Sequence, residues 1–286
     1  MRTIYNTLVE ERTMNQQISR FKQYLLTEEK GSVTVEKYLR DVRCFYSFLD
    51  NRAISKEETI AYKEHLTQQY APASVNSMLV ALNCFLRFIG KTDCCVKQLK
   101  IQRQIFCGEE KELTQSEYQL LVKAAKNTRL SLVIQTICST GIRVSELQYI
   151  TVEAVRVGKA VVNCKNKTRV IFIPMSIQKL LKTYIKKSGV TAGSVFVTRS
   201  RKPLNCRNIW RDMKALCEQA GVSPDKVFPH NLRHLFARTF YSVDKDIVRL
   251  ADLLGHSSVD TTRIYTRETG SEHRHRLERV EKLLMT

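Results

Sequence analysis

Apolar side chains recur every three or four positions between residues 15 and 90, which is the spacing of one face of an α-helix. Short polar turns divide this stretch into four segments. We therefore expect helices over residues 15–29, 32–50, 55–69 and 72–90. Four short helices, each with one apolar face, predict a compact all-helical domain over residues 15–92, preceded by an N-terminal extension over residues 1–14.

The helical pattern is lost between residues 93 and 112, where Lys, Cys, Gln and Glu are mixed without a period. We interpret residues 93–112 as a linker. A second domain over residues 113–286 begins with Thr114, followed three positions later by Glu117, and this spacing is that of a helix capping box.

Strand periodicity marks the middle of the second domain. Two β-rich runs, residues 160–163 and 169–173, flank a basic turn and predict a hairpin, and residues 194–198 predict a third strand. The remainder is expected to be helical. The fold class is therefore mainly α, with a small three-stranded antiparallel sheet in the second domain.

The last segment, about residues 271–286, is strongly charged but keeps a helical apolar stripe. Leu277, Val280 and Leu284 share one face of this expected C-terminal helix. Such a stripe packs either on its own domain or on a second molecule.

Positive charge is concentrated in the second domain. The chain has 286 residues, 43% of them hydrophobic, and a net charge of +19. Residues 1–110 carry +3 of this and residues 111–286 carry +16. A folded domain with such an excess favours nucleic acid as a partner.

The nine cysteines include no C-x-x-C pair, and most lie among apolar residues, which is typical of free thiols in a reducing cytoplasm. No apolar run reaches the length of a membrane helix, and the N-terminus lacks the apolar core of a signal peptide. We therefore expect a cytoplasmic location.

Two arginines are candidates for binding a phosphodiester. Arg143 lies in the run Thr-Gly-Ile-Arg-Val-Ser-Glu-Leu, and Arg233 lies in His-Asn-Leu-Arg-His. A guanidinium offers planar paired donors to the non-bridging oxygens, which gain charge in the transition state. A single arginine of this kind is usually an ordinary surface residue, but the two surrounding runs favour a phosphate clamp.

Tyr265 is the candidate nucleophile among eleven tyrosines. A free phenol has a pKa of about 10, so it needs a base or a positive field for attack. His230 is placed to take the proton and His256 to donate to a phosphate oxygen. Tyr241 is the rival nucleophile, but it continues an apolar helix face, and we interpret it as packing. His234, His273 and His275 are expected to lie outside the site.

The departing 5′-hydroxyl needs a proton, and a lysine at the hairpin tip is suited to supply it. Lys165 is the first candidate and Lys167 the alternative. The sequence has no cluster of carboxylates suited to two Mg²⁺ ions and no G-x-x-x-x-G-K-[ST] loop. We therefore expect no cofactor and no metal, with cationic side chains stabilising the transition state instead.

These motifs resemble those of the tyrosine recombinases, the phage-integrase family, in their Xer-like form. The resemblance is strongest over residues 140–147, 230–237 and 253–266. It implies that the first domain is a core-binding DNA-binding domain of SAM-like type and the second the catalytic domain. Carried over position by position, it implies the roles given above for the two arginines, the two histidines and Tyr265, and it adds a supporting acidic position at Glu146.

The hairpin departs from the family pattern. The Xer-like form is Gly-Lys-Gly-Asn-Lys, whereas this chain reads Cys164-Lys165-Asn166-Lys167 and lacks both glycines. Lys165 matches the family lysine, but the changed tip keeps Lys167 open as the proton donor.

The resemblance implies site-specific recombination of double-stranded DNA through a 3′-phosphotyrosine and a Holliday junction. It implies a homotetramer on two DNA sites, with the C-terminal helix docked on a neighbouring protomer, and it leaves room for an accessory protein. Two alternatives remain at this point: strand relaxation of the type IB topoisomerase kind, and a catalytically inactive DNA-binding regulator.

Overall fold

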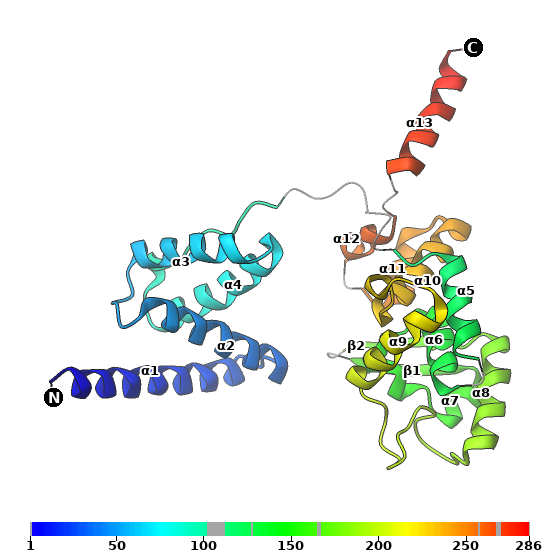
Figure 1. Cartoon of the computed structure of the whole chain (residues 1–286), viewed down its shortest axis with the longest axis horizontal. Coiled ribbons are helices and arrows are strands. Elements are labelled where there is room, and N and C mark those ends of the chain that lie inside the picture. Colours follow the sequence, from blue (N-terminus) through cyan, green and yellow to red (C-terminus); the bar gives the residue numbers. More distant parts are fainter. Residues whose placement is uncertain are drawn as a thin grey trace. The chain divides into compact units, whose positions relative to one another are not determined.

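The computed structural model describes residues 2–101, 112–126, 128–164, 167–256, 258–266 and 270–285. The chain divides into two compact units, Met1–Arg103 and Gln104–Thr286, and each is described by itself (Figure 1). Within the described ranges, no helix has both the length and the apolar character needed to span a bilayer.

The first unit consists of four helices, as the periodicity predicted. They are α1 (Arg2–Thr27), α2 (Ser32–Leu49), α3 (Lys56–Gln69) and α4 (Pro72–Phe88). Helix α1 begins at Arg2, well before the predicted start at residue 15. Ser55 caps α3 by accepting from the Glu58 amide, and α4 begins with a proline, which suits the first turn of a helix. Phe21, Phe45 and Phe85 are fully buried between the helices.

The segment that follows α4 packs on the first unit, although its sequence has no helical period. It begins with a short 3₁₀ helix, η1 (Thr92–Cys94), and continues without regular secondary structure. The Asn83 amide donates to the Val96 carbonyl at 2.8 Å and accepts from the Val96 amide at 3.0 Å. Asn76 makes the same pair of bonds with Leu99, at 2.9 and 2.7 Å. Two asparagines of α4 therefore hold this part of the expected linker.

The second unit is a helical domain with one small hairpin. Its first half comprises α5 (Gln115–Ala124), α6 (Arg129–Thr140), the 3₁₀ helix η3 (Val144–Tyr149), α7 (Val152–Val157), β1 (Lys159–Cys164), β2 (Lys167–Phe172) and α8 (Met175–Ser188). Its second half comprises α9 (Cys206–Ala220), α10 (Pro229–Asp244), α11 (Ile247–Leu254), α12 (Val259–Thr262), the 3₁₀ helix η5 (Arg263–Thr266) and α13 (Gly270–Leu284). The capping box predicted for Thr114 and Glu117 is confirmed at the start of α5.

The described sheet has two strands, not the three that were expected. Strands β1 and β2 pair antiparallel from Lys159–Phe172 to Cys164–Lys167. Residues 194–198 form only isolated bridges, Thr151–Ser194 and Val197–Pro203. The backbone bonds of this segment go to Ile150, Arg201, Lys202 and Leu204, and none of these residues belongs to β1 or β2. The β-rich composition was interpreted correctly as extended backbone but wrongly as a third strand.

Helix α10 lies against α6 and carries the C-terminal motifs of the second unit. It packs on α6 and also contacts α11 and η5. Ala237, Leu250, Leu254 and Tyr265 form a small buried cluster at this junction, next to the main core of the unit. This packing brings segments that are more than a hundred residues apart in sequence into one region (Figure 1).

Candidate active site

The Arg143 turn depends on Gly141. Helix α6 ends at this glycine, whose φ of 63° lies in the left-handed region that favours glycine. A Cβ atom here would overlap the Phe236 ring of α10. The chain then turns into η3 with Arg143 at its N-cap position, and the Glu146 side chain reaches back to accept from the Arg143 amide at 2.9 Å. The turn therefore fixes the backbone of Arg143 before its side chain is considered.

Glu146 is a buried carboxylate between two arginines. Its side chain is 2% exposed. Oε1 accepts from Arg143 Nη1 at 2.9 Å, and Oε2 accepts from Arg169 Nη2 at 2.5 Å. Charge-assisted bonds of this kind compensate the cost of burying the carboxylate. Arg143 itself stays partly exposed, with its Nη2 at 3.4 Å from the Gly255 carbonyl.

Arg233 lies on α10 and is almost fully buried, with 2% exposure. It donates to the carbonyls of Gly141 and Leu254, the latter at 2.7 Å. Burial and, second, the Arg143 cation lower the pKa of Arg233 to about 10, whereas the nearby Tyr265 side chain raises it. The guanidinium therefore remains charged at neutral pH, and its carbonyl partners fix its direction.

His256 follows α11 at a turn made by Gly255, whose φ is 63°. Its Nε2 lies 3.1 Å from Arg233 Nη2, and its Nδ1 lies 2.8 Å from the Thr262 hydroxyl oxygen. A guanidinium can only donate, so Nε2 accepts and Nδ1 carries the proton, which it donates to Thr262. Burial, followed by the charge of Arg233, lowers the pKa of His256 to about 4, so the ring is neutral at pH 7.

Tyr265 is brought to the same place by η5 and is 2% exposed. Its ring stacks on the His256 ring, with centroids 5.8 Å apart and planes at 16°. The His234 ring meets it edge-on at 4.4 Å. His234 was expected outside the site, but it lies one helical turn after His230 and so shares a face of α10 with it. The two histidine centroids are 5.2 Å apart.

His230 reaches this cluster through His234. Burial lowers its pKa, and the cations Arg233 and Arg143 lower it further. The structure thus brings together Arg143, Glu146, Arg233, His256 and Tyr265, with His230 one ring away. Lys165 lies outside the described residues, as do the side chain of Lys167 and that of His273. His275 is exposed on α13, and Tyr241 packs beside the small buried cluster.

Three site neighbours were not found from the sequence: Arg169, His234 and Thr262. Arg169 had a signal in the sequence. It lies two positions before the buried Ile171 in β2, and residues two apart in a strand lie on the same face. Thr262 is a fully buried hydroxyl in a polar run, and only the position of His256 shows why it is there.

The family is shown by comparison of the sequence with family models. The model of the phage integrase family matches residues 111–272, and that of the phage integrase N-terminal SAM-like domain matches residues 18–91. The chain belongs to the phage integrase family and is a tyrosine-type site-specific recombinase.

Relatives with known names agree with this assignment. The chain is 29% identical to the tyrosine recombinase XerA of Thermococcus kodakarensis, covering 94% of this chain and 96% of the relative. It is also 29% identical to the tyrosine recombinase XerC of Pediococcus pentosaceus, covering 88% and 93%.

Solved structures share the fold. A crystal structure of XerA recombinase is 26% identical, with a TM-score of 0.53 over 93% of this chain and 98% of that chain. XerH bound to a palindromic difH substrate in a post-cleavage complex has a TM-score of 0.73 at 18% identity, covering 96% of each chain. A lambda integrase tetramer bound to a Holliday junction has a TM-score of 0.69 at 18% identity, covering 88% and 76%.

Proposed function

We propose that Tyr265 attacks a DNA phosphodiester held between Arg143 and Arg233. The phenolic oxygen bonds to phosphorus, the bond to the 5′-oxygen breaks, and a 3′-phosphotyrosine forms with a free 5′-hydroxyl. A 5′-hydroxyl from a second duplex then attacks the phosphotyrosine and regenerates the phenol. The contact of Arg233, His256 and Tyr265 carries this proposal, since it places a buried cation, an imidazole and a phenol around one point.

The two arginines would neutralise the charge that develops on the non-bridging oxygens. Arg233 is held by carbonyls, and Arg143 by Glu146, so both are oriented before the substrate arrives. Preorganised donors in a site without water are worth more than the same donors in solution. Glu146 acts here by holding Arg143.

The histidines would handle protons in complementary ways. His230 is neutral at pH 7 because burial lowers its pKa, so it is able to accept the phenolic proton. His256 is also neutral, with Nε2 turned to Arg233. A bound phosphate adds negative charge beside these cations and raises the His256 pKa, which favours an Nε2 proton that is donated to a phosphate oxygen.

A lysine of the hairpin would protonate the leaving 5′-oxygen. Lys165 is the proposed donor and Lys167 the alternative; the paired strands end at Cys164 and Lys167. A substrate with sulfur at the 5′-bridging position separates the two, because a thiolate leaves without a proton. Lys165→Ala and Lys167→Ala are compared on both substrates. The lysine whose loss slows cleavage of ordinary DNA, but not of the sulfur substrate, is the donor.

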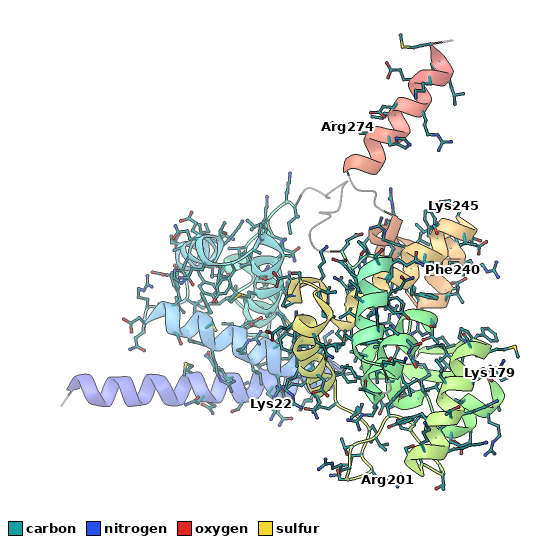
Figure 2. All side chains as sticks on the ribbon, turned by 45° about the vertical axis from the view of Figure 1, so that its right-hand side comes forward. Lys22, Lys179, Arg201, Phe240, Lys245 and Arg274 are labelled. Atoms are coloured by element: carbon teal, nitrogen blue, oxygen red, sulfur yellow. The ribbon has the colours of Figure 1, made fainter. Side chains whose placement is uncertain are left out.

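DNA is the proposed partner of both units. The helical unit, which matches the SAM-like model, is the proposed core-binding domain over residues 15–92, joined by residues 93–112 to the catalytic domain over residues 113–286. Basic side chains such as Lys179, Arg201 and Lys245 are exposed on the second unit (Figure 2). Because lambda integrase forms a tetramer on a Holliday junction, we propose four copies on two sites here.

A nicked duplex tests the chemistry. It carries a site selected from random DNA by binding to this protein, with a nick just downstream of the scissile phosphate, so that the short fragment bearing the new 5′-hydroxyl diffuses away. We expect a covalent adduct on a denaturing gel for the unaltered chain and for Tyr241→Phe, and none for Tyr265→Phe. An adduct with Tyr265→Phe would exclude this nucleophile. Relaxation of supercoiled plasmid without the site would instead support a topoisomerase.

A further inference from the structure

Arg169 links three separate parts of the site. It comes from β2 of the hairpin, and its Nη2 donates to Glu146 Oε2 at 2.5 Å. Its Nη1 donates to the Leu253 carbonyl at 3.1 Å. Its side chain also lies over Gly255, where an added Cβ would come within 2.6 Å of Arg169 Cδ. One side chain thus touches the hairpin, the acidic partner of Arg143 and the turn that carries His256.

Glu146 could otherwise bind Arg143 through both oxygens. Carboxylates and guanidinium groups commonly form two parallel hydrogen bonds, a geometry that would use both terminal nitrogens of Arg143. In the structure only Nη1 of Arg143 is bound to Glu146, at Oε1. Oε2 is occupied by Arg169 and by the backbone amide of Arg143. Arg143 Nη2 is therefore left with one long contact, 3.4 Å to the Gly255 carbonyl.

We infer that Arg169 is a positioning residue, which occupies Glu146 and thereby keeps Arg143 Nη2 available to the scissile phosphate. The inference rests on the proposed role of Arg143. It also explains why a third cation is placed beside Arg143 and Arg233, where it repels both. The cost of this repulsion is offset because Glu146 is shared between the two cations that it contacts.

Arg169 also fixes the position of the hairpin. Arg169 is two positions after Lys167 and four after Lys165. Its bond to the Leu253 carbonyl therefore ties the strand that leads away from these lysines to the end of α11. Loss of Arg169 is expected to affect both the phosphate clamp and the docking of the hairpin.

The test compares Arg169→Gln, Arg169→Lys and Arg143→Ala with the unaltered chain on two nicked duplexes. One duplex has an ordinary scissile phosphate and the other a neutral methylphosphonate, which has less need of a guanidinium. We expect Arg169→Gln to slow adduct formation on the phosphate by about 10- to 100-fold. The loss should shrink on the methylphosphonate, as for Arg143→Ala. Arg169→Lys, which keeps a cation for Oε2, should lie between.

The matched control is Arg156→Gln, which removes the same charge from an exposed position on α7. It should cleave both duplexes like the unaltered chain. The inference is overturned if folded Arg169→Gln cleaves the phosphate normally, or if its loss is the same on both duplexes. If Arg169→Gln does not fold, Arg169→Lys must show the same difference between duplexes. Absence of any adduct with the unaltered chain would contradict the proposed function instead.

Discussion

At the residue scale, the direction of one hydrogen bond decides which ring nitrogen of His256 carries the proton. Arg233 donates to Nε2, so the proton is on Nδ1 and is bound by the Thr262 hydroxyl. Thr262 is fully buried, and its hydroxyl lies 2.8 Å from His256 Nδ1. It is therefore expected to orient the imidazole in the way that second-layer hydrogen bonds orient ligands in other sites.

Thr262→Val keeps the shape of this side chain and removes its hydroxyl. The Nδ1 proton then lacks a partner, which costs about 1–3 kcal/mol of stability. We also expect adduct formation to slow by about tenfold as the ring loses its direction. Single-turnover cleavage and urea unfolding measure the two effects. Thr262→Ser retains the hydroxyl and should behave like the unaltered chain; equal losses in both variants would contradict this role.

The lowered pKa of His256 makes the stability of the second unit depend on pH. The folded value of about 4 is below the ordinary 6.5, so the unfolded chain binds more protons between these values. The free energy of unfolding therefore rises with pH through this window and is flat above it. With allowance for solvent screening of a half-buried ring, the change is about 1 kcal/mol.

Urea unfolding at pH 5 and pH 7 measures this dependence. His256→Asn cannot titrate in this range and should reduce the difference between the two pH values. His275→Asn, an exposed position on α13, should leave the difference unchanged. An unaltered pH dependence in His256→Asn would show that other groups cause it.

The residues of the site divide into those with a sequence signal and those without. Arg143, His230, Arg233, His256 and Tyr265 stand in dense motifs, and the structure places them together. Arg169 has only the weak signal of its strand face, and Thr262 lies within the run 253–266 without a feature that singles it out, because the role of each depends on its contacts across the fold. His234 was excluded because its neighbour Arg233 points into the site. Neighbouring side chains on a helix diverge, yet His234 still reaches Tyr265, since η5 covers that face of α10.

At the element scale, the segment after α4 shows how a chain without a period can still be fixed. Asn83 is 7% exposed and satisfies both the amide and the carbonyl of Val96. Asn83→Ala leaves two buried backbone groups without this partner, so we expect the first unit to lose about 2–3 kcal/mol. Thermal unfolding measures the loss, and Gln68→Ala, at an exposed position on α3, is the control. A loss below about 0.5 kcal/mol would mean that the segment does not depend on this bond.

The helices were predictable because each buries one face, so that apolar residues recur every three or four positions in the sequence. The segment after α4 was read as linker because asparagine side chains hold it, and side-chain bonds to backbone leave no period. Residues 194–198 have strand composition, but their backbone bonds go to Ile150 and to the turn that follows them, at Arg201, Lys202 and Leu204, and not to the hairpin. Pairing is decided by the fold around a segment, and composition shows only that the segment is extended.

At the scale of the whole molecule, the uneven charge predicts how DNA binding responds to salt. Residues 111–286 carry +16 of the +19 net charge. If the protein contacts six or more phosphates, its affinity should fall about a thousandfold between about 50 and about 200 mM salt. Fluorescence anisotropy with a labelled duplex measures the slope. An uncharged peptide nucleic acid duplex of the same sequence should show none, and a flat response with DNA would contradict phosphate-dominated binding.

Helix α13 presents an apolar stripe that its own chain leaves exposed. Leu277, Val280 and Leu284 lie on one helical face, and each is exposed in the structure. An exposed stripe of this kind favours a partner, and we propose that the partner is the neighbouring protomer on DNA. Burying each of these side chains is worth about 1.5–3 kcal/mol. Val280→Asn with Leu284→Asn should therefore weaken assembly by about 100-fold or more.

Assembly and chemistry separate in this variant. A single protomer on a nicked half-site should still form its phosphotyrosine adduct, because Val280 and Leu284 are exposed and make no contact with the site residues described above. The recombined product should be lost. The four-protomer complex on two duplexes should also be lost, as measured by sedimentation. Arg279→Asn with Lys282→Asn changes two residues off the apolar stripe and should leave assembly intact. If the stripe variant still forms the four-protomer complex, α13 packs on its own chain, and the contact between protomers must lie elsewhere.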